Sequence, residues 1–131
     1  MKIWVFLIAV LIGCGGKPSV PSVEIRQLVF QLQQSDCVII GGVGITGRVN
    51  PAADSYTTLL RIVPDSVWVR LSYNEKAVVR MYAYEALFSK SSPELEQVKI
   101  RLKRDTAMVC QIFDDVTITA SIGEFVSLGR R

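Results

Sequence analysis

Apolar and polar positions follow the period of a helix over residues 74–90, near the middle of the chain. One continuous apolar stripe, at positions i, i+3, i+4, i+7 and i+8, is made of Val79, Tyr82, Ala83, Ala86 and Leu87. Asn74 is a favourable N-cap residue for this helix. Lys76, Arg80 and Tyr84 follow one another four positions apart on another side, which can face water. The pattern therefore predicts a central amphipathic helix.

Start and stop residues predict further helices on both sides of this one. Residues 23–35 carry apolar positions at helical spacing. Asn50 and Pro51 indicate a helix start, because Asn caps an N-terminus and Pro fits the first helical position. That helix is expected to end near Ile62, since the residue before Pro64 is pushed out of the helical region. Further short helices are expected at residues 64–71, 93–102 and 121–128.

Three stretches lack a clear helical pattern. Residues 36–40 form a short apolar run that can extend the preceding helix or form a strand. Residues 41–47 contain four glycines and are expected to form a loop or a tight turn. Residues 107–119 are rich in Val, Ile, Thr and Phe, which weakens the prediction of a helix. The structure of residues 107–120 therefore stays open.

The N-terminus has the pattern of an export signal. Lys2 precedes the apolar residues 3–12, which span about 15 Å as a helix, too short for a bilayer core of about 30 Å. A short apolar run behind a basic N-terminus is typical of a secretory signal peptide. The residues Leu11-Ile12-Gly13-Cys14 resemble the lipobox of bacterial lipoproteins. The alternative is an ordinary buried N-terminal helix with an incidental Cys.

The lipobox resemblance implies cleavage before Cys14 and a diacylglyceryl group on its thiol. Residues 1–13 are then a signal peptide, residues 14–22 a flexible tether, and residues 23–131 a single domain. Two or three acyl chains would hold the protein on its membrane, since each buried CH₂ contributes about 0.8 kcal/mol. We expect a lipid-anchored protein of the bacterial cell envelope, facing the periplasm or the cell surface. The sequence does not distinguish the inner from the outer membrane.

The central helix resembles the second helix of a HEAT-like repeat. Val79 and Arg80 are followed by the small residues Ala83 and Ala86, which allow helices to approach closely. Residues 91–105 look like the first helix of the next repeat. Only one repeat is well matched, whereas a solenoid usually needs three or more. The resemblance implies a mainly α fold, a small HEAT-like helical bundle or short solenoid.

A second resemblance covers about two-thirds of the chain. The glycine-rich loop from Gly41, the helix of residues 78–87 and Cys110 resemble features of a family of uncharacterised bacterial proteins. That resemblance implies no activity.

Charge and composition argue against several classes of function. Without Lys2 the chain has 14 basic residues (15 − 1) and 12 acidic residues, a net charge of +2 that is too mild to argue for nucleic acid. The chain contains no His, the commonest general base and metal ligand. Its three Cys residues form neither a CxxC motif nor a zinc spacing. We expect no metal, no cofactor and no enzymatic activity.

Several residues are of types that can form a functional site. Gly42, Gly44 and Gly47 satisfy GxGxxG, but the next helix starts several residues too late for a dinucleotide site, so a structural loop is favoured. The doublet of Asp114 and Asp115 is expected to be a turn or a solvated pair. The aromatic residues that could line a ligand pocket are expected to be core residues: Trp68, Tyr82 and Tyr84.

Cys37 and Cys110 remain after lipidation of Cys14. A domain outside the cytoplasm can keep a disulfide, which would close a long loop. Each Cys nevertheless has apolar sequence neighbours, and free Cys is often buried as a small hydrophobe. The sequence favours two buried thiols and leaves the pairing open.

The leading hypothesis is a membrane-anchored envelope lipoprotein whose helical domain is a non-catalytic protein-interaction module. Its partners would be membrane lipid, through acylated Cys14, and an envelope protein bound in a groove between helices. The alternative is a small-ligand-binding or enzymatic domain that uses the loop from Gly41 to Gly47.

Overall fold

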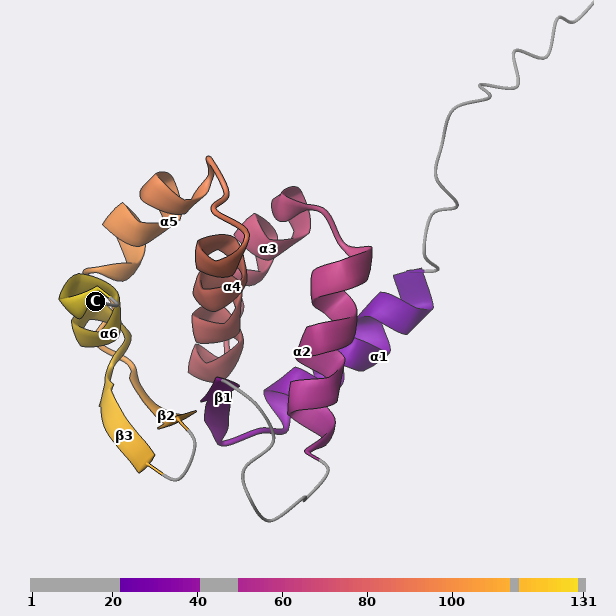
Figure 1. Cartoon of the computed structure of the whole chain (residues 1–131), viewed down its shortest axis with the longest axis horizontal. Coiled ribbons are helices and arrows are strands. Elements are labelled where there is room, and N and C mark those ends of the chain that lie inside the picture. The colour runs from indigo at the N-terminus through magenta and orange to yellow at the C-terminus, as the bar shows by residue number, and fades with distance from the viewer. Residues whose placement is uncertain (1–21, 41–49, 114–115, 130–131) are drawn as a thin grey trace, which may run out of the picture.

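The computed structural model describes residues 22–40, 50–113 and 116–129. In order, the elements are α1 (Ser22–Gln33), β1 (Cys37–Ile40), α2 (Pro51–Ile62), α3 (Asp65–Leu71), α4 (Ala77–Ser89), α5 (Leu95–Leu102), β2 (Met108–Phe113), β3 (Val116–Ser121) and α6 (Ile122–Leu128). Figure 1 shows α4 near the centre, with α1, α2 and α3 on one side and α5, α6, β2 and β3 on the other.

The predicted bounds of α2 are confirmed. The side-chain oxygen of Asn50 accepts hydrogen bonds from the backbone N–H groups of Ala52 and Ala53, so Asn50 is the N-cap. Pro51 occupies the first helical position. The helix ends at Ile62, and the residue before the next proline has an extended backbone.

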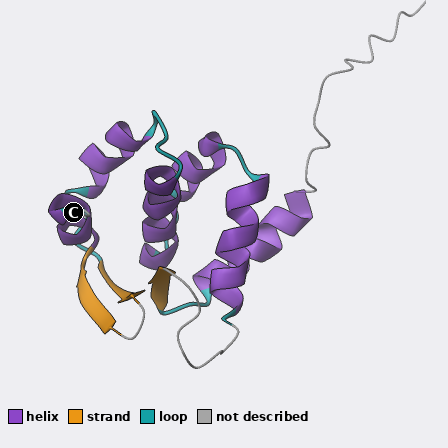
Figure 2. Ribbon diagram, in the orientation of Figure 1, coloured by secondary structure: helices purple, strands orange, loops and turns teal. Residues whose placement is uncertain are grey.

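The strands overturn the prediction of a mainly α fold. They form one three-stranded sheet in the order β1-β2-β3, in which β1 is parallel to β2 and β2 is antiparallel to β3. Figure 2 shows the sheet on one side of the helices, below α4 and α6. Periodicity alone cannot assign a short apolar run to helix or strand. Here pairing between distant segments decides the question, and the protein has a mixed α/β fold.

The prediction of a HEAT-like bundle or short solenoid is wrong for a related reason. α4 packs against α1, α3 and α5, and it also packs against β1 and β2. Nine of its 13 residues are buried. A solenoid would stack another helix pair beside this one. In this protein the sheet covers α4 instead.

The apolar stripe of α4 is buried as predicted, because each of these residues is 0% exposed: Val79, Tyr82, Ala83, Ala86 and Leu87. The opposite side differs from the prediction. Tyr84 is only 4% exposed, and Arg80 is mostly buried in an ion pair. The helix begins at Ala77, later than predicted, because Asn74 accepts a hydrogen bond from the N–H of Lys76 in the preceding turn. Only Lys76 is exposed as expected.

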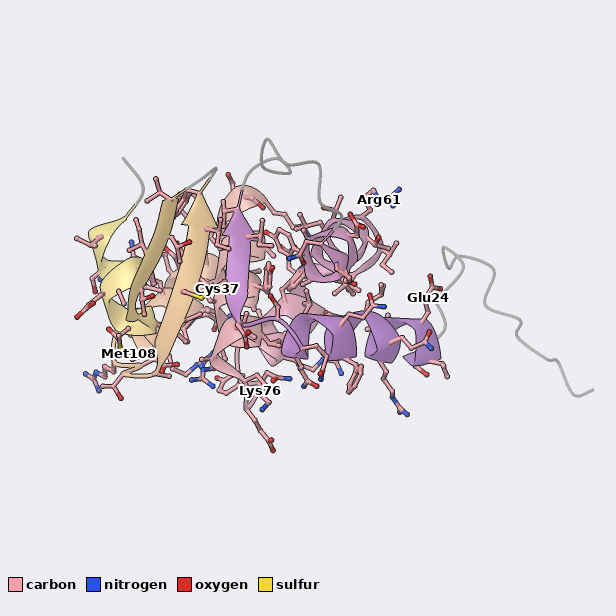
Figure 3. The ribbon with its side chains drawn as sticks, turned by 90° about the horizontal axis from the view of Figure 1, so that it is seen from below. Glu24, Cys37, Arg61, Lys76 and Met108 are labelled. Carbon is pink, nitrogen blue, oxygen red and sulfur yellow. A yellow bond between two sulfur atoms is a disulfide. The ribbon has the colours of Figure 1, made fainter. Side chains whose placement is uncertain are left out.

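A disulfide joins β1 to β2. Cys37 and Cys110 are direct partners in the parallel register, and their Cα atoms are 4.6 Å apart, within the range of about 4.4–6.8 Å that a disulfide needs. Figure 3 shows the sulfur between the two strands. The prediction of two free thiols is therefore wrong. Its failure has the same cause as the missed sheet, since the two residues are 73 positions apart and meet only when the strands pair.

Candidate functional site

A groove between α1 and α3 is the candidate functional site. Its volume is about 450 Å³. The apolar residues that line it include Ile25, Val29, Val67 and Leu71. Phe30 also lines the groove and is 59% exposed. An exposed aromatic beside apolar lining is typical of an interaction surface.

Two arginines give the groove a positive charge. Arg26 from α1 and Arg70 from α3 both line it, and both side chains are exposed. Within the residues that the structure describes, neither guanidinium forms a hydrogen bond or an ion pair. The groove therefore combines apolar lining with two positive charges that have no partner in the described part of the chain. This combination favours an apolar occupant that carries acidic groups.

Contacts behind the groove hold its two walls in place. A hydrogen bond from the Ser55 hydroxyl to the Gln31 side-chain oxygen links α2 to α1. On α3, Trp68 is 0% exposed and packs edge-on against Tyr56 of α2, with 5.7 Å between the ring centroids. Both walls are thus fixed to α2, which leaves the groove-facing side chains open to solvent.

The N-terminus of α3 is tied to the chain after α4. The Asp65 carboxylate lies 2.5 Å from Lys90 Nζ and accepts a hydrogen bond from the Ser92 hydroxyl at 2.5 Å. The hydrogen bond from Lys90, followed by that from Ser92, lowers the pKa of Asp65. The Asp65 and Lys90 side chains are about a third exposed, so we expect this pair to add well under 1 kcal/mol.

Some predicted site residues lie outside the described residues. These are Cys14, the glycine-rich loop of residues 41–47, and the doublet of Asp114 and Asp115. In the part of the chain that is described, no three His, Cys, Asp or Glu residues lie together as a metal site. No helix in that part is long and apolar enough to cross a bilayer.

The three candidate aromatics are buried, as predicted for core residues, although Tyr84 also lies on the side of α4 that was expected to be open to water. Trp68 and Tyr82 are 0% exposed and both pack against Tyr56. The Tyr82 hydroxyl accepts a hydrogen bond from the Ile39 N–H at 3.1 Å, which satisfies a backbone donor of β1. Burial raises the pKa of Tyr82. Tyr84 differs from the other two because it also lines a small cavity next to the sheet.

The sequence alone does not identify the groove residues. Arg26 and Phe30 are four positions apart in α1, which places them on one side of that helix. An aromatic residue one turn from a charged residue on the same side of a helix is the one signal that could have indicated an exposed site. Arg70 gave no such signal, because its place beside α1 depends on how the helices pack.

Comparison with known proteins does not assign a family. No protein-family model matches the chain, and a search of curated proteins finds no match.

Proposed function

We propose that this protein is a lipid-anchored envelope lipoprotein whose domain is a non-catalytic binding module. Its α1–α3 groove binds an acidic, amphipathic segment of an envelope protein. The observation that carries the proposal is a pair of arginines beside an apolar groove, neither of which has a partner among the described residues. Apolar side chains of the bound segment would fill the groove, and its carboxylates would pair with Arg26 and Arg70.

Two independent features support the location. The N-terminal residues resemble a lipoprotein signal, and the Cys37–Cys110 disulfide suits the oxidising conditions outside the cytoplasm. Only residues 15–21 separate Cys14 from α1, and an extended chain of that length reaches at most about 30 Å. The groove would then lie close to the membrane that holds the anchor, within reach of a membrane-associated partner.

Replacement of the acylated residue tests the anchor. Cys14→Ala should abolish incorporation of radiolabelled palmitate and leave a soluble or uncleaved, unlipidated protein, because the thiol is the only proposed attachment point. A variant with both Cys37→Ala and Cys110→Ala is the matched control and should keep the label. Palmitate labelling that persists in Cys14→Ala would overturn the lipoprotein proposal.

Crosslinking in intact cells tests the groove. A photo-crosslinking amino acid in place of Phe30 should capture one envelope protein, through a segment that is acidic and amphipathic. The same group in place of Arg61, which is exposed on α2 (Figure 3), should not capture it. Mass spectrometry of the crosslinked peptide identifies the segment.

Charge reversal tests the role of the two arginines in that crosslink. Arg26→Glu together with Arg70→Glu should lower the crosslinking yield by about tenfold, since two attractions become repulsions. Lys76→Glu changes an exposed charge outside the groove and should leave the yield unchanged. Crosslinks to lipid, or to a segment without acidic residues, would contradict the proposed partner.

A further inference from the structure

A small cavity lies between the sheet, α4 and α6, away from the α1–α3 groove. Its volume is about 170 Å³. Four aromatic side chains line it: Tyr84, Phe88, Phe113 and Phe125. The first two stand on α4 with their ring centroids 6.1 Å apart, whereas the other two come from β2 and α6. The cavity therefore exists only because the C-terminal strands fold back against α4.

One polar side chain in this cavity has an unmet hydrogen bond. Gln111 lines the cavity and is 2% exposed, and its Nε2 has no hydrogen-bond partner among the described residues. Its neighbours on the same face of the sheet, Val38 of β1 and Ile118 of β3, are apolar and cannot supply one. A buried amide donor without a partner is unfavourable and uncommon in folded proteins. An acceptor that enters the cavity would satisfy it.

We propose that this cavity binds a small, uncharged ligand that contains a ring and a hydrogen-bond acceptor oxygen. The ring packs among the aromatic side chains, and the oxygen accepts a hydrogen bond from Gln111 Nε2. The size agrees, because an apolar cavity of about 150 Å³ holds a benzene molecule. This site shares no residue with the groove, so the proposal stands or falls separately from the proposed function.

The charge of the lining excludes an anionic ligand. Glu85 also lines the cavity and is 5% exposed, and among the described lining residues there is no Lys or Arg. A carboxylate or phosphate would therefore place a second negative charge beside a buried acid. A cationic ligand would find aromatic faces, but it would leave the Gln111 amide donor unsatisfied. A neutral carbonyl compound meets both conditions.

Two nearly isosteric probes separate the hydrogen bond from simple filling of the cavity. Acetophenone has a carbonyl oxygen where α-methylstyrene has a methylene group. In NMR titrations both probes should shift the backbone signals of the lining residues, and acetophenone should shift the Gln111 side-chain amide further than α-methylstyrene does. Acetophenone should bind about fivefold more tightly, the fold-change expected for one net hydrogen bond.

The matched variant is Gln111→Leu, which keeps the side-chain size and removes the donor. It should fold, since it replaces an unsatisfied buried group by an apolar one. It should bind the two probes with equal affinity. If Gln111→Leu does not fold, Gln111→Met serves the same purpose. Absence of shifts at the cavity, equal affinity of the unmodified protein for both probes, or tighter binding of tetramethylammonium would each overturn the proposal.

Discussion

Loss of the Cys37–Cys110 disulfide is expected to lower the free energy of unfolding by about 4 kcal/mol, the largest effect that we predict. The two residues are 73 positions apart, and the bond restricts the unfolded chain over that whole loop. In the chain-entropy model, a loop of this length corresponds to about 4 kcal/mol at 25 °C. The loop includes α2, α3, α4 and α5, so the bond restrains most of the domain.

Guanidinium unfolding of the oxidised and reduced protein measures this effect. The reduced protein should unfold at a markedly lower denaturant concentration and melt more than about 15 °C lower. A variant with Cys37→Ala and Cys110→Ala should behave like the reduced protein, and reductant should not change it further. Intact mass should differ by about 2 Da between the two forms, one hydrogen for each sulfur in the bond. Equal stability with and without reductant would mean that the bond contributes nothing.

The local parts of the fold could be predicted from the sequence because their causes are local. Asn50 and Pro51 start α2 wherever the helix later packs, and the residue before Pro64 must leave the helical region. Ser121 likewise starts α6, because its hydroxyl and the Glu124 side chain form a capping box. These signals involve residues a few positions apart, so the chain itself contains all the information they need.

The sheet could not be predicted in the same way. β1 has only four residues, and its partner β2 lies beyond four helices. No periodic pattern in either segment identifies the other. The errors for Tyr84 and for the two Cys residues follow from this one omission. Tyr84 faces the cavity beside the sheet, and Cys37 meets Cys110 only when the strands pair.

The candidate site could not be predicted either, because it depends on how the helices pack. Arg26 belongs to α1 and Arg70 to α3, and the groove appears only when those helices lie side by side. The sequence led us to expect a groove between helices, but it did not indicate which residues line it. Gln111 is a further example, because a glutamine in a β-rich segment is unremarkable until both of its sheet neighbours on that face prove to be apolar.

The second large effect is expected at Arg80, where Arg80→Leu should cost about 3 kcal/mol. Its guanidinium donates hydrogen bonds to both carboxylate oxygens of Asp105, at 2.8 and 3.2 Å, and to the carbonyl oxygens of Asn74 and Glu75. The paired side chains are only 16% and 17% exposed. Removal of one partner from a mostly buried pair leaves the other charge uncompensated, which typically costs about 3–5 kcal/mol when burial is complete.

The Arg80–Asp105 pair also holds together three parts of the domain. The Asp105 carboxylate accepts a third hydrogen bond, from the Ala107 N–H through Oδ1, and its backbone carbonyl oxygen accepts one from the Gly123 N–H at 2.9 Å. The pair thus links the start of α4, the turn before β2 and the start of α6. Loss of Arg80 should therefore loosen the docking of α6 as well as weaken α4.

Urea unfolding of three variants tests this account. Lys90→Leu breaks the more exposed pair with Asp65 and should cost less than about 1 kcal/mol. The comparison of this variant with Arg80→Leu shows how much of the loss is due to burial of the pair and how much to the removal of a positive charge. The double variant Arg80→Leu with Asp105→Leu should be less destabilised than the sum of the two single variants, because neither charge is then left alone. Hydrogen exchange should rise at the Gly123 amide in Arg80→Leu and stay unchanged in Lys90→Leu. Equal losses for Arg80→Leu and Lys90→Leu would contradict the role given to the buried pair, since only the Arg80 pair joins α4 to the turn that holds α6.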